Sequence, residues 1–176
     1  MKIILRLLLL LALPLFSRAE NYDVVIRHGL VVDGSGNPGF HADVAVKAGR
    51  IAAIGKIDGS AKEEIDATGL VVAPGFIDVH THADDVADFP RAENFLRMGV
   101  TSIVVGNCGS SGLDIGKLFK NIENKKVSLN VASLIGHNSV REKAMGGSFD
   151  REPSAIEREH MKEIVRQAMR DGVVGL

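Results

Sequence analysis

The sequence contains a single cysteine, Cys108, among its 176 residues, so it cannot form a disulfide within the chain. It also lacks a long basic run, and its formal net charge is −1. Neither a nucleic-acid partner nor an anionic lipid surface is therefore indicated. With 45% hydrophobic and 24% charged residues, the composition is that of an ordinary globular protein.

The apolar run near the N-terminus, Leu7–Phe16, is too short to cross a bilayer comfortably, which takes roughly 20 residues. Two basic residues precede it, and Ser17–Ala19 offers the small residues of a signal-peptidase site. We therefore predict a signal peptide at residues 1–19, with cleavage before Glu20. We expect the mature protein to be periplasmic or extracellular and to have no stable membrane anchor. An uncleaved anchor is the alternative, and a lipoprotein is excluded because no cysteine follows the apolar run.

Residues 20–70 contain several short β-like runs and are predicted to form a β-rich unit. Ala48–Gly49 lies between two of these runs and is predicted to be a tight hairpin turn. Gly34–Gly39 fits the dinucleotide-binding pattern G-x-G-x-x-G, but the residues that follow continue as a strand. Because a dinucleotide site needs a helix to begin there, we interpret this segment as a glycine-rich hairpin loop.

Two histidines end the next apolar stretch, Val71–His82, which is predicted to be a buried strand. Alternate side chains of a strand share a face, so Asp78, His80 and His82 should point the same way, toward a cavity at the strand's C-terminal end. Two imidazoles directed at one point suit a metal ion. A lone His-x-His, however, also occurs by chance on many surfaces.

Cys108 follows the next predicted strand. A short helix at 92–99 and a buried strand at 100–105 complete a βαβ unit, which should bring Cys108 to the same edge of the sheet as the histidines. The residues alone leave three hypotheses open: a structural cysteine, a nucleophile and a metal-binding thiolate. A nucleophile would need a base within hydrogen-bond reach, and His137 is the nearby candidate in the sequence.

The rest of the chain continues the alternation of strands and helices. Residues 127–135 are a third apolar run, and the polar, glycine-containing segment 139–151 is predicted to be a long loop. Ser154–Glu157 is a capping box that begins a helix, which should end at Gly172. Residues 173–176 are predicted to begin a fourth strand.

The stretch Pro74–His82 resembles the signature of the metal-dependent amidohydrolase superfamily. Gly99–Thr101 together with Gly106–Gly109 is similar to the D-aminoacylase (N-acyl-D-amino-acid deacylase) branch, and the resemblance extends from about Tyr22 to Leu176. It implies an α/β fold: the N-terminal part of a (β/α)8 TIM-like barrel, preceded by a small β-sandwich segment.

On this resemblance, residues 20–70 are the sandwich segment. Residues 71–176 are the first three βα units and the start of the fourth strand. A complete barrel needs about 250 residues, so the chain is predicted to be a truncated, N-terminal fragment.

The resemblance also implies a site and a reaction. His80, His82 and Cys108 would bind one or two Zn²⁺ ions, and His137 and Arg141 would contact the substrate. The aspartate that serves as base would come from a later strand. The implied reaction of the intact enzyme is hydrolysis of a small-molecule N-acyl-D-amino acid to a carboxylate and a D-amino acid, with the fragment alone inactive.

Two alternatives to this function are kept. The first is a cyclic amidase of the same superfamily, similar to dihydroorotase or hydantoinase. Such enzymes usually carry a lysine where this chain has Cys108. The second is a non-catalytic, truncated remnant.

Overall fold

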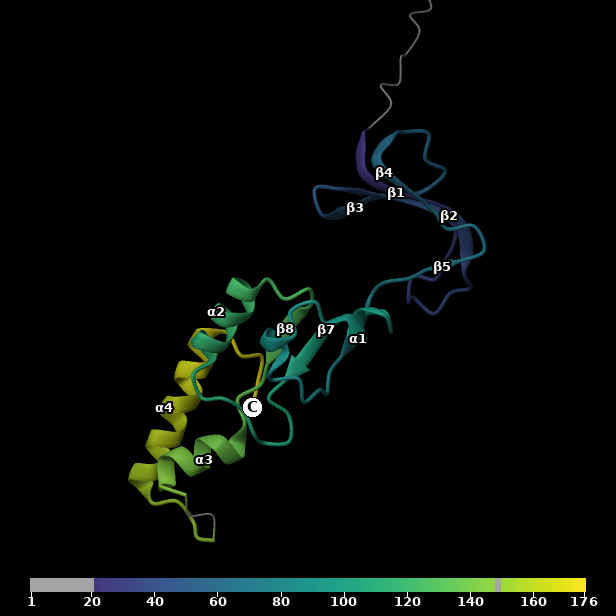
Figure 1. Ribbon diagram of the computed structural model, residues 1–176. Helices are drawn as coiled ribbons and strands as arrows, with labels where there is room; N and C mark the ends of the chain where they lie inside the picture. The colour runs from purple at the N-terminus through teal and green to yellow at the C-terminus, as the bar shows by residue number, and fades with distance from the viewer. Residues whose placement is uncertain (1–20, 148–149) are drawn as a thin grey trace, which may run out of the picture. The chain divides into compact units, whose positions relative to one another are not determined.

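The computed structural model describes residues 21–147 and 150–176, which form two compact units that divide between Pro74 and Gly75 (Figure 1). The predicted signal peptide, residues 1–19, lies outside the described residues. Within the described part of the chain, no helix is long and apolar enough to span a membrane.

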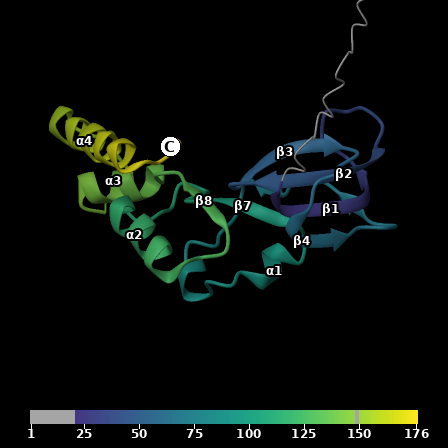
Figure 2. The ribbon, with the colours of Figure 1, turned by 90° about the horizontal axis from the view of Figure 1, so that it is seen from above.

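The first unit is a five-stranded sheet with the order β3-β2-β1-β4, and β5 pairs with β1 as well (Figure 2). β2 is antiparallel to both β1 and β3, whereas β4 and β5 run parallel to β1. Its buried core contains Val25 and Ala45. The strands are β1 (Tyr22–Val31), β2 (Phe40–Lys47), β3 (Arg50–Gly55), β4 (Ala61–Asp66) and β5 (Val71–Val72).

Both predicted connections of this sheet are confirmed. Ala48 and Gly49 join β2 to β3 with φ values of 50° and 72°, the positive values that a type I′ hairpin turn requires. Gly34–Gly39 lies in the loop between the antiparallel strands β1 and β2. No helix begins in that loop, so the dinucleotide interpretation is excluded there.

The division between the units differs from the predicted one, which separated residues 20–70 from 71–176. Val71 and Val72 pair with Leu30 and Val31, so β5 belongs to the first sheet and the division follows Pro74. Sequence reasoning also missed β4, because its residues are mostly charged and exposed. Its backbone hydrogen bonds to β1 hold it in place as an edge strand.

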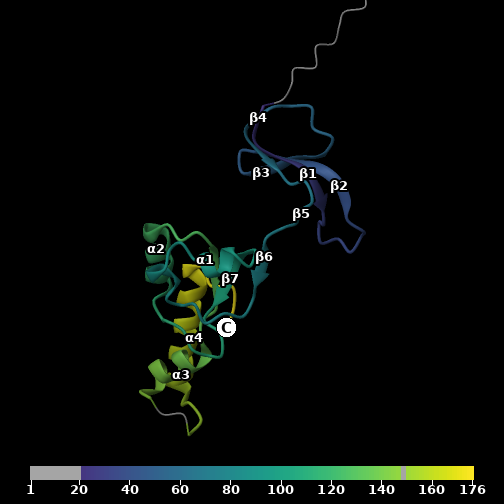
Figure 3. The ribbon, with the colours of Figure 1, turned by 45° about the vertical axis from the view of Figure 1, so that its right-hand side comes forward.

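The second unit contains a three-stranded parallel sheet with the order β6-β7-β8, and β6 and β7 are labelled in Figure 3. The helices lie between and after these strands, as the predicted βα alternation requires. The strands are β6 (Phe76–Asp78), β7 (Val100–Val105) and β8 (Asn130–Ser133), and the helices are η1 (Val86–Asp88), α1 (Glu93–Leu96), α2 (Ile115–Lys125), α3 (His137–Met145) and α4 (Ala155–Asp171).

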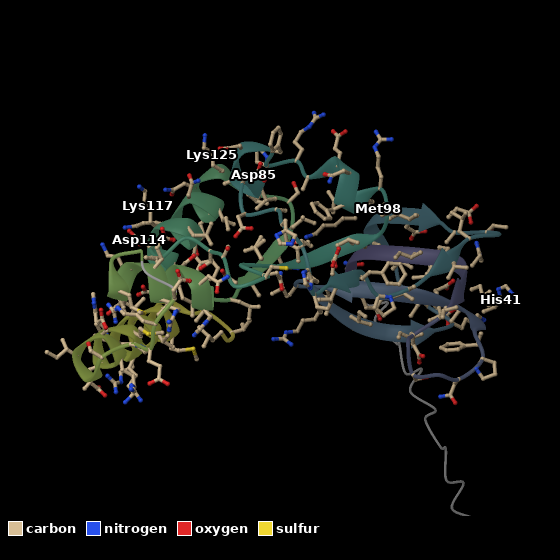
Figure 4. The ribbon with its side chains drawn as sticks, turned by 90° about the horizontal axis from the view of Figure 1, so that it is seen from below. His41, Asp85, Met98, Asp114, Lys117 and Lys125 are labelled. Carbon is tan, nitrogen blue, oxygen red and sulfur yellow. The ribbon has the colours of Figure 1, made fainter. Side chains whose placement is uncertain are left out.

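Two apolar clusters hold this unit together. In one, Ile103 and Val105 of β7 pack with partly buried residues of α2, such as Leu118 and Ile122. In the other, Ile135 packs with residues of α2, α3 and α4. Asp114 caps α2 by accepting a hydrogen bond from the Lys117 amide, and both residues are labelled in Figure 4.

The predicted fourth strand is present as a single bridge. Gly175 pairs in parallel with Leu134, and hydrogen bonds run from Ile135 N to Gly175 O and from Val174 N to Ser133 O. The predicted helix is α4, which begins at the Ser154–Glu157 capping box and ends at Gly172. The helix prediction is confirmed, and the fourth strand is represented by this bridge alone.

Two other predictions are wrong. Residues 139–151 were expected to be a loop, but α3 extends to Met145, because Val140 and Met145 bury one side of it and Gly146 ends it with φ of 70°. The stretch that ends in the histidines was expected to be buried, but Ile77 and Val79 are mainly exposed. β6 pairs only with β7 among the described strands, so it is an edge strand of this sheet.

Candidate metal centre

Three potential ligand atoms converge at one edge of the second unit's sheet. The Sγ atom of Cys108 lies 3.4 Å from Nε2 of His80 and 3.6 Å from Nε2 of His82. All three atoms lie within 4.8 Å of one another, and all three side chains are exposed. The predicted convergence of His80, His82 and Cys108 is therefore present in the structure.

The histidines reach this point through the turn that follows β6. The strand ends at Asp78, whose carboxylate accepts a hydrogen bond from the backbone N–H of His80 at 3.1 Å. Thr81 turns inward and is only 6% exposed, so the imidazoles on either side of it lie on the outer side of the turn. Alternation continues past the strand, so the two imidazoles lie on one side, as the sequence pattern predicts.

Cys108 is held in a tight turn that follows β7. The N–H of Ser110 donates to the carbonyl of Asn107 at 3.3 Å, and the two central residues, Cys108 and Gly109, have φ values of 57° and 78°. Positive φ at both central positions is the pattern of a type I′ turn. A non-glycine residue in this region costs ~1–2 kcal/mol, so surrounding contacts must hold Cys108 there.

The separations fit a metal ion in both geometry and donor type. Zn–S and Zn–N bonds of ~2.3 and ~2.05 Å at a tetrahedral angle place sulfur and nitrogen about 3.6 Å apart. The two sulfur–nitrogen distances at Cys108 are 3.4 and 3.6 Å. A mixed set of imidazole and thiolate ligands suits a borderline-soft ion such as zinc.

His137 and Arg141 lie apart from these ligands. Both line an open pocket of about 530 Å³ between α3 and α4, and the described residues that line it include none of the three ligands. The guanidinium of Arg141 donates to the carbonyl of Arg151. His137 nevertheless begins α3, and the next residue, Asn138, donates its N–H to the carbonyl of Gly109 at 2.8 Å. Substrate contacts of His137 and Arg141 remain a prediction.

A second open pocket, of about 730 Å³, adjoins one ligand directly. His82 lines it together with Asp85, Phe89 and Phe95, and all four come from the segment between β6 and β7. Asp85 is labelled in Figure 4. Sequence reasoning did not identify this space, because it depends on how that segment folds back on itself. It leaves one side of the candidate metal centre accessible within this unit.

Comparisons with known proteins show which family the chain is similar to. A family model described as "Amidohydrolase family" matches residues 63–116. N-acyl-D-glutamate deacylase of Alcaligenes xylosoxydans xylosoxydans is 37% identical over 180 residues, which cover 89% of this chain and 37% of the relative.

Two solved structures are also similar. The first is N-acyl-D-glutamate deacylase from Bordetella bronchiseptica, in complex with zinc and a phosphonate inhibitor that mimics the tetrahedral intermediate of its reaction. It matches with a TM-score of 0.83 at 35% identity, over 89% of this chain and 38% of that one. The second is a D-aminoacylase with a binuclear metal centre. It has a TM-score of 0.81 at 30% identity and covers 88% of this chain and 38% of that one.

The fold and the family match together point to the amidohydrolase superfamily. The chain belongs to the amidohydrolase superfamily and, within it, to the D-aminoacylase branch, whose N-terminal part it matches. It spans about 37% of the length of the curated relative described above. The predicted α/β class is confirmed, with a β-strand unit followed by part of a barrel.

Proposed function

We propose that this chain is part of a metal-dependent enzyme that hydrolyses the linear amide bond of N-acyl-D-amino acids. The observation that carries the proposal is the placement of the Cys108 thiol 3.4 and 3.6 Å from two imidazole nitrogens. Similarity to N-acyl-D-glutamate deacylase and D-aminoacylase supports the substrate class. The three parallel strands would be the first strands of a (β/α)8 barrel completed by further chain.

The residues of this chain would hold the ion and leave its open side to the substrate. His80 and His82 would each present Nε2 as a neutral imidazole, and Cys108 would bind as a thiolate. When bound, zinc lowers the pKa of a water molecule toward neutrality and polarises the carbonyl of the amide. The carboxylate that moves the proton to the leaving amine would come from a later strand.

The number of ions depends on how many further ligands later strands of the intact enzyme supply. Three ligands from one chain segment can hold one zinc ion with an open fourth position, as catalytic zinc sites do. Ligands from further strands would add a second ion or complete the first. We propose Zn²⁺, as one or two ions, and the solved relatives named above hold zinc or a binuclear metal centre.

The test is Cys108→Ser in the intact enzyme that contains this chain. We expect the variant to lose bound zinc, measured by elemental analysis, and to lose hydrolysis of an N-acetyl-D-amino acid, because a neutral hydroxyl is a poor zinc ligand. The matched control is Cys108→Ser combined with Ser110→Cys, which keeps a thiol in the same turn at a position outside the ligand cluster. That double variant should not recover zinc.

An alternative outcome would assign Cys108 a different role. If an alkylating substrate analogue labelled Cys108 during turnover while the zinc content of Cys108→Ser matched that of the unmodified enzyme, the cysteine would be a nucleophile. Hydrolysis of N-acetyl-L-amino acids at the rate of the D-enantiomers would contradict the proposed substrate class.

The chain by itself should bind zinc weakly and should not turn over substrate. Its three ligands lie on the segments after β6 and β7, and no described residue completes the shell with a further histidine or a base. Calorimetric titration of the chain with zinc, beside an assay of the intact enzyme, checks this. Submicromolar zinc affinity or turnover equal to that of the intact enzyme would show that the site is complete within these residues.

A further inference from the structure

Two buried polar side chains lie between the segments that carry the candidate ligands. Among residues 21–147 and 150–176, only Thr81, Asn107 and Ser133 are polar and buried. Thr81 stands between His80 and His82 with 6% exposure, and Asn107 directly precedes Cys108 with 7% exposure. Burial of a polar group is unfavourable unless it forms hydrogen bonds, so the partners of these two side chains indicate what they do.

Both side chains bind the same backbone atom, the carbonyl oxygen of Val104 in β7. This oxygen accepts hydrogen bonds from Thr81 Oγ1 at 2.8 Å, from Thr81 N at 3.1 Å and from Asn107 Nδ2 at 2.9 Å. Asn107 Nδ2 also donates to the carbonyl of Thr81 at 3.1 Å. Two of these four hydrogen bonds join the histidine turn to β7, one joins Asn107 to β7, and the bond from Asn107 Nδ2 to the carbonyl of Thr81 joins the cysteine turn to the histidine turn directly.

The chemistry of asparagine suits this position. One amide nitrogen has two hydrogens, and here it donates to two carbonyl oxygens on different segments. Aspartate has the same shape but would place a carboxylate against both carbonyls, and alanine makes neither bond. The backbone carbonyl of Asn107 also closes the turn in which Cys108 adopts φ of 57°.

We propose that Asn107 and Thr81 are positioning residues that hold the Cys108 thiol at ligation distance from His80 and His82. The proposal rests on the metal centre proposed above. Without the clamp formed by Asn107, Thr81 and the Val104 carbonyl, the cysteine turn can shift relative to the histidine turn while the β6-β7-β8 sheet stays intact. The three donors then no longer fit one ion. Partners of this kind commonly change metal affinity 10- to 100-fold when they are removed.

The experiment is a titration of the metal-free intact enzyme that contains this chain with cobalt(II), followed by the thiolate-to-cobalt charge-transfer absorption. Asn107→Ala and Thr81→Val should each raise the cobalt dissociation constant about tenfold or more. They should also lower the charge-transfer absorption at saturating cobalt. Thr81→Ser keeps the hydroxyl that binds the Val104 carbonyl and should restore both values. This rescue separates positioning from a general loss of stability.

The chain offers a matched control in Asn130. Its Nδ2 also donates twice, to Thr101 O at 3.1 Å and Ser102 Oγ at 3.3 Å, but near the start of β7, where no candidate ligand lies. Asn130→Ala should leave cobalt binding unchanged. If the far-ultraviolet circular dichroism of Asn107→Ala shows that the variant is unfolded, the positioning role is tested by comparing Thr81→Val with Thr81→Ser. Valine preserves the shape of threonine but lacks its hydroxyl.

The outcomes separate this proposal from the one on which it rests. If His80→Ala and Cys108→Ser leave the cobalt spectrum unchanged, the metal centre itself is wrong. If those two variants abolish the charge-transfer absorption but Asn107→Ala and Thr81→Val bind cobalt like the unmodified enzyme, the metal centre stands and the positioning role is refuted. The same refutation follows if Asn130→Ala weakens binding as much as Asn107→Ala does.

Discussion

Gly136→Ala should disturb the candidate metal centre from a position that carries no ligand. Gly136 precedes α3 and has φ of −69°, which alanine also adopts, so the backbone conformation itself is no obstacle. An added Cβ atom would lie 2.4 Å from the carbonyl oxygen of Gly109 and 2.7 Å from the carbonyl carbon of Ser110. Both atoms belong to the turn that carries Cys108.

The size of the effect follows from these contacts. Cβ atoms essentially never approach another heavy atom within 3.0 Å, so the Gly109 carbonyl must retreat by about 0.6 Å. Overpacking of this kind costs roughly 1–3 kcal/mol. Alanine is also a poorer N-cap than glycine by about 0.5–1 kcal/mol. We expect a loss of about 2–4 kcal/mol in the free energy of unfolding.

The assay is urea unfolding followed by circular dichroism, together with the cobalt titration described above. Gly112→Ala is the matched control, because an added Cβ there meets nothing within 4 Å, and we expect its unfolding free energy to stay within about 0.5 kcal/mol. Equal midpoints for the two variants, or unchanged cobalt affinity in a destabilised Gly136→Ala, would refute the claim that this contact fixes the cysteine turn.

Two further predictions concern other parts of the chain. The pKa of Glu157 is lowered from 4.5 to about 2, chiefly by hydrogen bonds from Arg151 and next by the backbone N–H of Ser154. Because a depressed carboxyl pKa stabilises the fold above the unfolded value, this contribution should be complete at neutral pH and should be lost as pH falls from about 4.5 to 2. Glu157→Gln should therefore lower the urea midpoint at pH 7 and converge with the unmodified chain near pH 2, and parallel midpoints over that range would contradict this. For export, mass spectrometry of secreted material should find a mature N-terminus at Glu20, whereas full-length chain recovered only from the cytoplasm would contradict the signal peptide.

The candidate ligands could be predicted because each depends on a local rule. Alternation along the chain puts His80 and His82 on one side, and parallel strands bring Cys108 to the same sheet edge. The first rule is local, and the second uses only the regular side-by-side pairing of consecutive strands in a βαβ unit. A local rule also predicts the capping box at Ser154 and the hairpin turn at Ala48–Gly49, where local hydrogen bonds and φ values decide the structure.

The failures have a common physical cause in tertiary contacts. The charged segment β4 is a strand because it forms backbone hydrogen bonds with β1. The polar segment α3 is a helix because Val140 and Met145 are buried on one side of it. The apolar pair Val71 and Val72 was predicted to begin the second unit, but their partner strand, β1, lies in the first sheet. In each case the deciding partner is distant in the sequence.

The clamp at the candidate metal centre shows the same limit at the level of single side chains. Asparagine and threonine beside possible ligands are ordinary turn residues in a sequence, and nothing in their types indicates burial. Their role becomes visible only when the carbonyl of Val104 is seen to accept hydrogen bonds from both. A sequence pattern can therefore name the atoms that bind a metal, because donor chemistry belongs to residue type. The distances between those atoms depend on buried hydrogen bonds between segments, and those are fixed only when the strands pair.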